Sequence, residues 1–188
     1  MMKVKEIAKV QAGSTPLRSN KIFYENGTIP WVKTLDLNNR EIKYTEEFIS
    51  ESAIEKTSCK VRPLGTVLVA MYGGFNQIGR TGLLAIEAAT NQAVSAIMVD
   101  KEVIRPEFLH YVLNAKVEYW KKVAISSRKD PNITKNDVEN FPVPVPNSFS
   151  VQDNIIEKIK ELIAFQEKLT FKISTSRNLQ KSLINQIF

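Results

Sequence analysis

The sequence has one cysteine and one histidine, and nowhere in it do about 18 apolar residues follow one another. Because Cys59 has no second cysteine, an intrachain disulfide is excluded and a thiolate metal site lacks its second sulfur. His110 is equally alone, so neither a His-based catalytic triad nor a His-rich metal site can be assembled. Without a membrane-length run or a signal-peptide core at the N-terminus, the sequence predicts a protein of the reducing cytoplasm.

Motifs of catalysis and cofactor binding are also missing. There is no G-x-x-x-x-G-K-[ST] phosphate loop, and the nearest string to the Asn/Asp-Pro-Pro-aromatic loop of an adenine methyltransferase is DPNI at 130–133. That string lacks the second proline and the aromatic residue. A carboxylate–lysine nuclease could use Asp36 with EIK at 41–43, but a chain with 24% charged residues contains such triplets by chance. We therefore expect a non-catalytic protein with no cofactor and no metal.

The charge balance favours an anionic partner. Lysine and arginine number 26 against 20 aspartates and glutamates, which gives a formal charge of +6 and a pI of about 9.3. This excess is compatible with nucleic-acid binding without requiring it. The hydrophobic share of 43% is ordinary for a packed domain, so disorder is not expected.

The chain changes character near residue 147. Before it, short apolar runs alternate with Gly, Pro and Asn, whereas the residues after Pro146 include neither glycine nor proline. Runs rich in Val, Leu, Ile and Ala predict buried strands. These runs lie at residues 65–72, 80–88 and 92–100. We therefore expect a domain over residues 1–147 and a separate element over 148–188.

Residues 106–123 predict an amphipathic helix packed on that sheet. Pro106 stands at its start, where a helix tolerates proline. Its apolar face recurs at steps of three and four. The face consists of Phe108, Tyr111, Val112, Ala115, Tyr119 and Lys122. Short strands with one or two helices indicate an α+β fold with a mixed, curved or partly closed sheet.

The proline-rich segment FPVPVP at 141–146 predicts a stiff connector, because each proline lacks an N–H and biases the preceding residue toward extended backbone. A long helix of about 37 residues follows, which spans about 55 Å at 1.5 Å per residue. Ser150 is its expected N-cap, and Asp153 lies in the first turn. A hairpin of two shorter helices is the alternative, although no glycine or proline marks a turn.

A narrow apolar seam runs along this helix at the spacing of a coiled coil. Steps of four and three define ten positions, of which seven are apolar. The positions are Ile155, Ile159, Leu162, Gln166, Leu169, Ile173, Ser176, Gln180, Leu183 and Ile187. We expect this seam to mediate dimerisation.

Three polar segments are candidates for contact with DNA. In GTIPWVKTLDLNN (27–39), Trp31 would anchor a strand end while the residues after it emerge on a loop. In YGGFNQIGRTG (72–82), glycines allow close approach, and Asn and Gln match an adenine edge. SSRKDPNITKND (126–137) is a basic loop. For each segment the alternative is a solvated loop or a turn cap without ligand. The candidate contacts are Lys33, Thr34, Asp36, Asn38, Asn76, Gln77, Arg80, Arg128, Lys129, Asn132 and Lys135.

The order of several blocks resembles a known family. KVKEIAKVQAGSTP, YENGTIPWVKTLDL, RPLGTVLVAMYGG, IGRTG, NQAVSAIMVD, NITKNDVENFPVPVP and VQDNIIEKI follow one another along almost the whole chain. This succession resembles the target recognition domain and spacer helix in the specificity subunits of type I restriction-modification systems. The resemblance implies a non-catalytic subunit that binds double-stranded DNA and directs adenine methyltransferase (M) and restriction (R) subunits to a bipartite sequence.

The chain departs from the family pattern in two ways. Family members usually carry P-x-x-E-Q before the helix, where this chain has Val151 before Gln152. They also usually have two recognition domains, whereas GTIPW and FPVPVP each occur once here. The resemblance therefore implies a half-length subunit, or a fragment of a full one, that forms a homodimer with antiparallel helices. Two alternatives stay open: a recognition module of a fused type II nuclease–methyltransferase, and a coiled-coil interaction protein with incidental basic charge.

Overall fold

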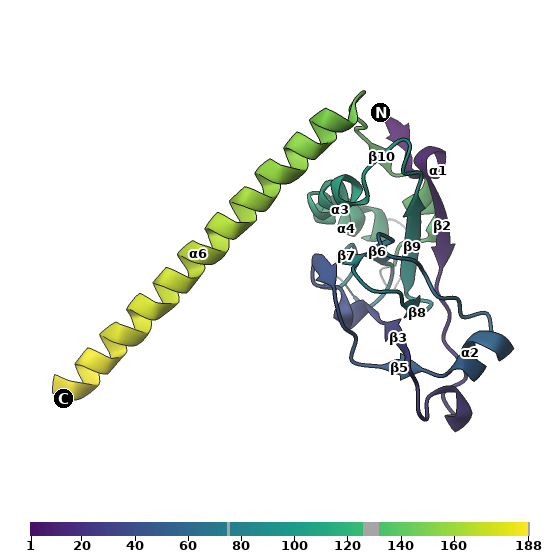
Figure 1. The fold of residues 1–188 in the computed structure, drawn as a ribbon, viewed down its shortest axis with the longest axis horizontal. Coiled ribbons are helices and arrows are strands. Elements are labelled where there is room, and N and C mark those ends of the chain that lie inside the picture. The colour runs from purple at the N-terminus through teal and green to yellow at the C-terminus, as the bar shows by residue number, and fades with distance from the viewer. Residues whose placement is uncertain (75, 126–131, 188) are drawn as a thin grey trace.

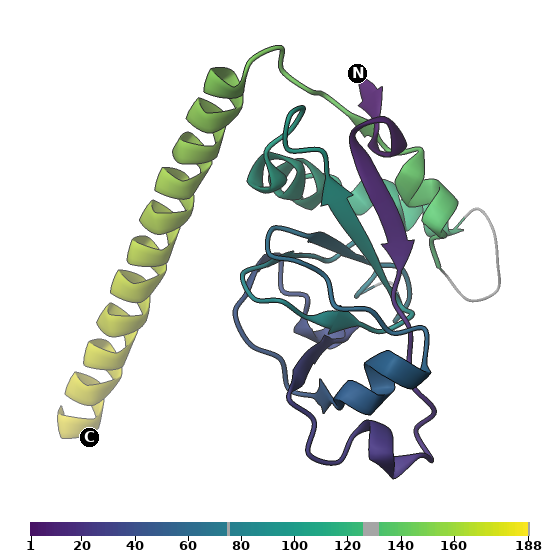
Figure 2. The same ribbon diagram turned by 45° about the vertical axis from the view of Figure 1, so that its right-hand side comes forward.

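The computed structural model describes residues 1–74, 76–125 and 132–187, with the side chains of Ile125 and Ile187 left out. It consists of a mixed α+β domain from which one long helix, α6, extends (Figure 1). The predicted fold class is confirmed. In both views α6 lies on one side of the domain and strand β2 on the other (Figures 1 and 2).

A five-stranded sheet forms the centre of the domain, in the order β2-β9-β6-β7-β4. Neighbouring strands are antiparallel except for β4 and β7, which are parallel. The strands are β2 (Ala8–Ala12), β4 (Arg40–Ile42), β6 (Val67–Ala70), β7 (Thr81–Leu84) and β9 (Val94–Val99). The three predicted strands correspond to β6, β7 and β9, of which β6 and β7 are buried on both faces along their whole length and β9 over its first four residues.

Two smaller sheets complete the domain. Strands β5 (Phe48–Ile49), β3 (Ile29–Val32) and β8 (Ala89–Thr90) form one of them, with β3 parallel to β8. The other pairs β1 (Met2–Lys3) with β10 (Pro142–Val143), so the proline-rich connector is tied to the start of the chain.

Short helices pack around the central sheet and the three-stranded sheet. They are α1 (Val4–Ile7), α2 (Glu51–Lys56), α3 (Pro106–Asn114), α4 (Val117–Ile125) and α5 (Lys135–Glu139), with 3-10 turns η1 (Lys21–Phe23) and η2 (Thr34–Asp36). The prediction of one helix over 106–123 was wrong, because Lys116 N donates to Leu113 O at 3.0 Å and this tightened turn ends α3. Within α4, Trp120 is buried and stacks on Phe141 with ring centroids 4.7 Å apart.

Helix α6 (Phe149–Ile187) runs for 39 residues without interruption, so the hairpin alternative was wrong. Ser148 rather than Ser150 caps it, since the Ser148 hydroxyl accepts from Val151 N at 3.3 Å. Gln152 fastens its first turns to the domain: its amide oxygen accepts from Arg105 N at 2.8 Å and its amide nitrogen donates to Val103 O at 3.1 Å.

A charged pair beside Gln152 adds to this attachment. Arg105 donates two hydrogen bonds to the carboxylate of Asp153, at 2.9 and 3.3 Å, and its guanidinium lies over the Phe149 ring. Gln152 and Ile156 are buried, at 1% and 5% exposed, whereas every described residue after Ile159 is exposed. The helix is therefore buried against the domain only at its root, and an exposed ion pair between Arg40 and Glu167 joins its middle to the start of β4.

Candidate nucleic-acid interface

Loops from distant parts of the sequence meet at one end of the central sheet. The loop before β4 joins the start of β7, because Asn39 N donates to Thr81 O at 2.9 Å. The loop before β9 joins the end of β3, since Asn91 N donates to Val32 O at 2.9 Å. Residue Ile133 is bonded to the start of the β6–β7 loop through Met71 O at 3.0 Å. All three segments predicted to contact DNA are thus attached to this end.

Trp31 is the anchor that the sequence predicts. It is 1% exposed, and its indole N–H donates to Ser14 O at 3.2 Å. Tyr24 meets it edge-on at 6.0 Å, and the Arg18 guanidinium lies 4.9 Å from its ring centroid. Strand β3 therefore ends at a fixed position, from which the 33–39 segment leaves.

The polar residues after Trp31 mostly hold their own loop together. Lys33 forms an ion pair with Glu47, which also binds Arg18. Thr34 is buried, at 9% exposed. The Asp36 carboxylate accepts from Lys33 N at 2.6 Å. The Asn38 amide oxygen accepts from Arg40 N at 3.2 Å. These bonds match the turn-cap alternative, and Asp36 and Asn38 also line surface cavities.

The glycine-rich loop 72–80 depends on left-handed backbone. Gly79 has φ +76°, and a Cβ there would lie 2.7 Å from the Trp120 ring. Asn76 is exposed and Arg80 is half-buried. The Gln77 amide oxygen is buried and has no hydrogen-bond partner within the part of the chain that the structure describes.

The third predicted segment is described only in part. Arg128 and Lys129 lie outside the described residues. Asn132 is half-buried, and Lys135 forms an ion pair with Glu139 at 3.0 Å. The capping box between Thr134 and Asp137 sets the start of α5, so Lys135 is presented from the first turn of a short helix.

A partly buried polar network behind the loops was missed by the sequence analysis. Asn39 adopts a left-handed conformation, with φ 64°, and its amide oxygen accepts from Thr81 N at 2.9 Å. Asn114 of α3 donates to Asn39 O at 3.1 Å and contacts His110 Nε2 at 3.4 Å. Burial lowers the pKa of His110 to about 4, against a smaller opposite effect of Glu41. The only histidine of the sequence is thus a neutral residue that supports the Asn39 turn.

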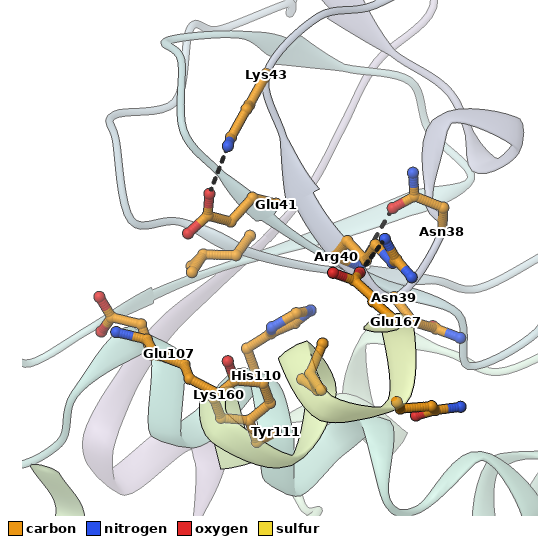
Figure 3. Close-up of a pocket in the computed structure, with 13 residues that line it drawn as sticks. Asn38, Asn39, Arg40, Glu41, Lys43, Glu107, His110, Tyr111, Lys160 and Glu167 are labelled. Atoms are coloured by element: carbon orange, nitrogen blue, oxygen red, sulfur yellow. Dashed lines mark hydrogen bonds and ion pairs between the residues drawn. The ribbon is translucent and has the colours of Figure 1, made fainter. Parts of the chain in front are cut away.

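A cavity of about 580 Å³ lies between this region and α6. Its walls come from the start of β4, from α3 and from α6 (Figure 3). Charges of both signs face it, including Arg40, Lys160 and Glu167, and Arg40 bridges to Glu167 at 2.9 Å. This exposed ion pair contributes little to stability. The mixture of charges gives the cavity no selectivity for an anion.

The apolar seam of α6 is largely open to solvent. Leu162, Leu169, Ile173 and Leu183 are 67%, 43%, 53% and 51% exposed. The domain buries Gln152 and Ile156 of this helix, and the seam residue Gln166 lines the cavity next to the domain. The side chain of Ile187 is outside the described part. Ile155, Ile159, Gln166, Ser176 and Gln180 are exposed or half-buried.

No group of three or more His, Cys, Asp or Glu side chains within the described ranges could hold a metal ion. In the same ranges, no helix has both the length and the apolar character needed to cross a membrane.

Sequence comparison finds relatives among specificity subunits. The chain is 22% identical over 166 residues to the specificity subunit of the EcoR124I/EcoR124II type I restriction enzyme of Escherichia coli, an alignment covering 88% of this chain and 41% of the relative. It is 28% identical over 185 residues to the MjaIX specificity subunit of Methanocaldococcus jannaschii, covering 91% and 41%. The chain thus spans about two fifths of the length of these relatives.

Solved structures share the fold. The HsdS subunit of Thermoanaerobacter tengcongensis matches with a TM-score of 0.67 at 18% identity, over 89% of this chain and 38% of that one. The type IIG restriction endonuclease BpuSI matches with a TM-score of 0.60 at 11% identity, over 85% and 26%. The family model for the type I restriction modification DNA specificity domain matches residues 1–175. The chain therefore belongs to the type I restriction modification DNA specificity domain family.

Proposed function

We propose that this chain binds double-stranded DNA sequence-specifically and directs a separate adenine-N6 methyltransferase subunit, and a restriction subunit with it, to a bipartite site. The observation that carries the proposal is the combination of the specificity-domain match with a 39-residue helix whose seam is exposed. Residues 1–147 would read DNA and residues 148–188 would set the spacing. The chain itself would contribute no catalytic group.

The domain would read DNA with the loops gathered at the end of the central sheet. Among the described candidates at this end, Asn38 and Asn76 are exposed and Arg80 is half-buried. Asn amides match the donor and acceptor of adenine, and Arg matches guanine or phosphate. Lys33 and Asp36 are committed to bonds within the domain, so we assign them to holding the loop rather than to touching bases.

The helix would pair with a second copy of itself. In an antiparallel pair centred on residue 171, Leu169 faces Ile173 of the partner subunit and Leu162 faces Gln180 of the partner subunit. The seam residues are about half exposed. Full burial of such a side chain contributes about 1.5–3 kcal/mol, and burial of its exposed half contributes about half of that. Four apolar residues from each of the two chains therefore contribute about 6–12 kcal/mol per dimer. These residues are Leu162, Leu169, Ile173 and Leu183. Association itself costs about 4–15 kcal/mol, so the most favourable combination of these ranges, about 8 kcal/mol net, corresponds to a micromolar dimer.

Such a dimer would place one recognition domain at each end of the helix pair. The two half-sites would then be read in inverted orientation. A helix of 39 residues spans about 58 Å at 1.5 Å per residue. At about 3.4 Å per base pair, the half-site centres would be at most about 17 base pairs apart.

The experiment that tests this function compares the purified chain with the chain plus its methyltransferase subunit. We expect no methyl transfer and no cleavage by the chain alone with S-adenosylmethionine, Mg²⁺ and plasmid, and sequence-specific methylation once the partner is added. Methylation or cleavage by the chain alone would contradict the non-catalytic role. If the methyltransferase subunit methylates the same sequence without the chain, the recognition role is contradicted.

A second candidate is a recognition module that belongs to a fused nuclease–methyltransferase polypeptide. The fold likeness to BpuSI favours it, because this domain covers only 26% of that chain. The two candidates differ in a simple observation: a native extract probed with an antibody to this domain would show a much heavier band in the fused case. A coiled-coil protein with incidental charge is not supported, since the family match extends over the domain as well as most of the helix.

A further inference from the structure

A second cavity, which we name the basic flank, lies on the side of the domain away from α6. It has a volume of about 510 Å³, and its lining comes from β2, the edge strand of the central sheet, from α5 and from segment 58–62. In Figure 2, β2 lies on the side of the domain away from α6. Its charged lining is Lys5, Lys9, Lys60, Arg62, Lys135 and Glu139. The cationic side chains thus outnumber the single carboxylate, and that carboxylate, Glu139, is already paired with Lys135 at 3.0 Å.

Arg62 provides a buried positive charge beneath the cavity. It is 5% exposed, and its backbone is fixed by two hydrogen bonds with Ala88. Its guanidinium donates to the Gln11 side chain and to Ala12 O, and both acceptors are neutral. The Arg62 Nε atom has no hydrogen-bond partner among the described residues. A buried charge without an opposite charge is costly unless one approaches from outside.

Burial lowers the pKa of the Arg62 guanidinium, and no carboxylate among the described residues raises it again. In most proteins a buried arginine is paired with an acid. Here the counter-charge is not supplied by the part of the chain that the structure describes, so an anionic ligand is the natural complement.

Lys9 and Lys60 are the free cations at the mouth of the cavity. Both are exposed, and within the described ranges the side chain of neither has a hydrogen bond or an ion pair. The other two lysines are engaged, Lys5 with the Asn140 amide oxygen at 3.1 Å and Lys135 with Glu139. The two free ammonium groups and the buried guanidinium all carry positive charge. Together they form a site suited to a phosphate group.

The position of the basic flank fits a duplex that is read at the loop end. Lys9 precedes Gly13, at the end of β2, by four residues, which is about 13 Å at 3.3 Å per residue. Segment 58–62 reaches the same end, because the Ser58 and Ser14 hydroxyls are 2.7 Å apart. The major groove of DNA is about 12 Å wide. If the loops read the major groove, the DNA backbone at the edge of that groove would therefore pass along β2.

We propose that the basic flank binds a phosphate of the DNA backbone, with Lys9 and Lys60 as its direct contacts and Arg62 as the buried charge beneath them. The proposal rests on the proposed DNA-reading function and goes beyond it, because it assigns the backbone contact to residues outside the three polar loops. Such a contact positions the duplex without specifying its sequence.

The test measures how affinity depends on salt. The intact chain, in complex with its methyltransferase subunit, is titrated with a DNA duplex that contains the sequence the complex methylates. The titration is repeated at salt concentrations between 50 and 200 mM. Each lost phosphate contact flattens the slope of log K against log[salt] by about 0.9, so the double variant Lys9→Gln with Lys60→Gln, which removes the contact to this one phosphate, should flatten it by about 0.9. Over that fourfold range, the wild type should lose about 3.5-fold more affinity than the double variant. The methylated motif should not change.

Two control variants separate this site from general charge. Lys101→Gln with Lys158→Gln removes the same charge from exposed positions outside the cavity and should leave the slope unchanged. Lys9→Arg with Lys60→Arg should restore the wild-type slope. The proposal is overturned if the Lys9/Lys60 glutamine variant keeps the wild-type slope, or if the control pair flattens it equally. A wild-type complex that shows no sequence-specific affinity would instead overturn the proposed DNA-reading function, and the basic flank with it.

Discussion

Replacing Leu169 with aspartate should dissociate the dimer while leaving each recognition domain folded. Leu169 is 43% exposed on the isolated helix. Burying the rest of a leucine contributes about 0.6–1.3 kcal/mol, or about 1.3–2.6 kcal/mol for the two copies in a dimer. Burying a carboxylate in the seam costs several kcal/mol more. At about 1.4 kcal/mol per factor of ten, the dissociation constant should rise by at least about a thousand-fold.

Sedimentation velocity over a concentration series from about 1 to 100 µM measures this shift directly. Asn178→Asp is the matched control: it introduces the same charge nine residues further on, half a turn round the helix from Leu169 at about 100° per residue. We expect the control to dimerise as the wild type does. If Leu169→Asp dimerises like the wild type, the interface does not involve this seam. If the wild type stays monomeric at tens of micromolar, the antiparallel pair is not the mechanism.

Two further predictions concern the domain and its junction with α6. Because the folded-state pKa of His110, about 4, lies below its usual value of about 6.5, stability should be full above pH 6.5 and fall by roughly 3 kcal/mol toward pH 4. The single histidine NMR signal should titrate near pH 4, and a midpoint near 6.5 would contradict burial. Gln152→Ala strands Arg105 N and Val103 O, so denaturant unfolding should show a loss of about 2–4 kcal/mol. The exposed control Asn154→Ala should cost far less, and equal losses would refute the anchor.

The strands and the long helix follow from local sequence patterns. Apolar runs such as VLVA and TGLL are short, bounded by turn residues, and buried on both faces of a central sheet. The absence of glycine and proline after Pro146 predicts an uninterrupted helix, and α6 is one. The helix break after Asn114 was not predictable in this way, because a single tightened turn at Lys116 leaves no mark on the periodicity.

The candidate site was only partly predictable, since its contacts join distant segments. Trp31 could be identified as an anchor from its position at a strand end, and burial confirms it. Whether Lys33 is free depends on Glu47, fourteen residues away, which the sequence does not place. The basic flank brings Lys9 next to Lys60 and Arg62 only because β2 is an edge strand. The left-handed turn at Asn39 could be predicted only weakly, because asparagine tolerates left-handed backbone but does not require it.

The central claim, that the chain confers sequence specificity as a two-fold dimer, is tested most directly by mapping N6-methyladenine. The DNA comes from a host that carries only this specificity chain and its methyltransferase subunit, and is sequenced with long reads. The account predicts one bipartite, inverted-repeat motif, with half-site centres no more than about 17 base pairs apart. A contiguous, non-palindromic motif would contradict the dimer, and methylation that is absent or independent of the chain would contradict the recognition role itself.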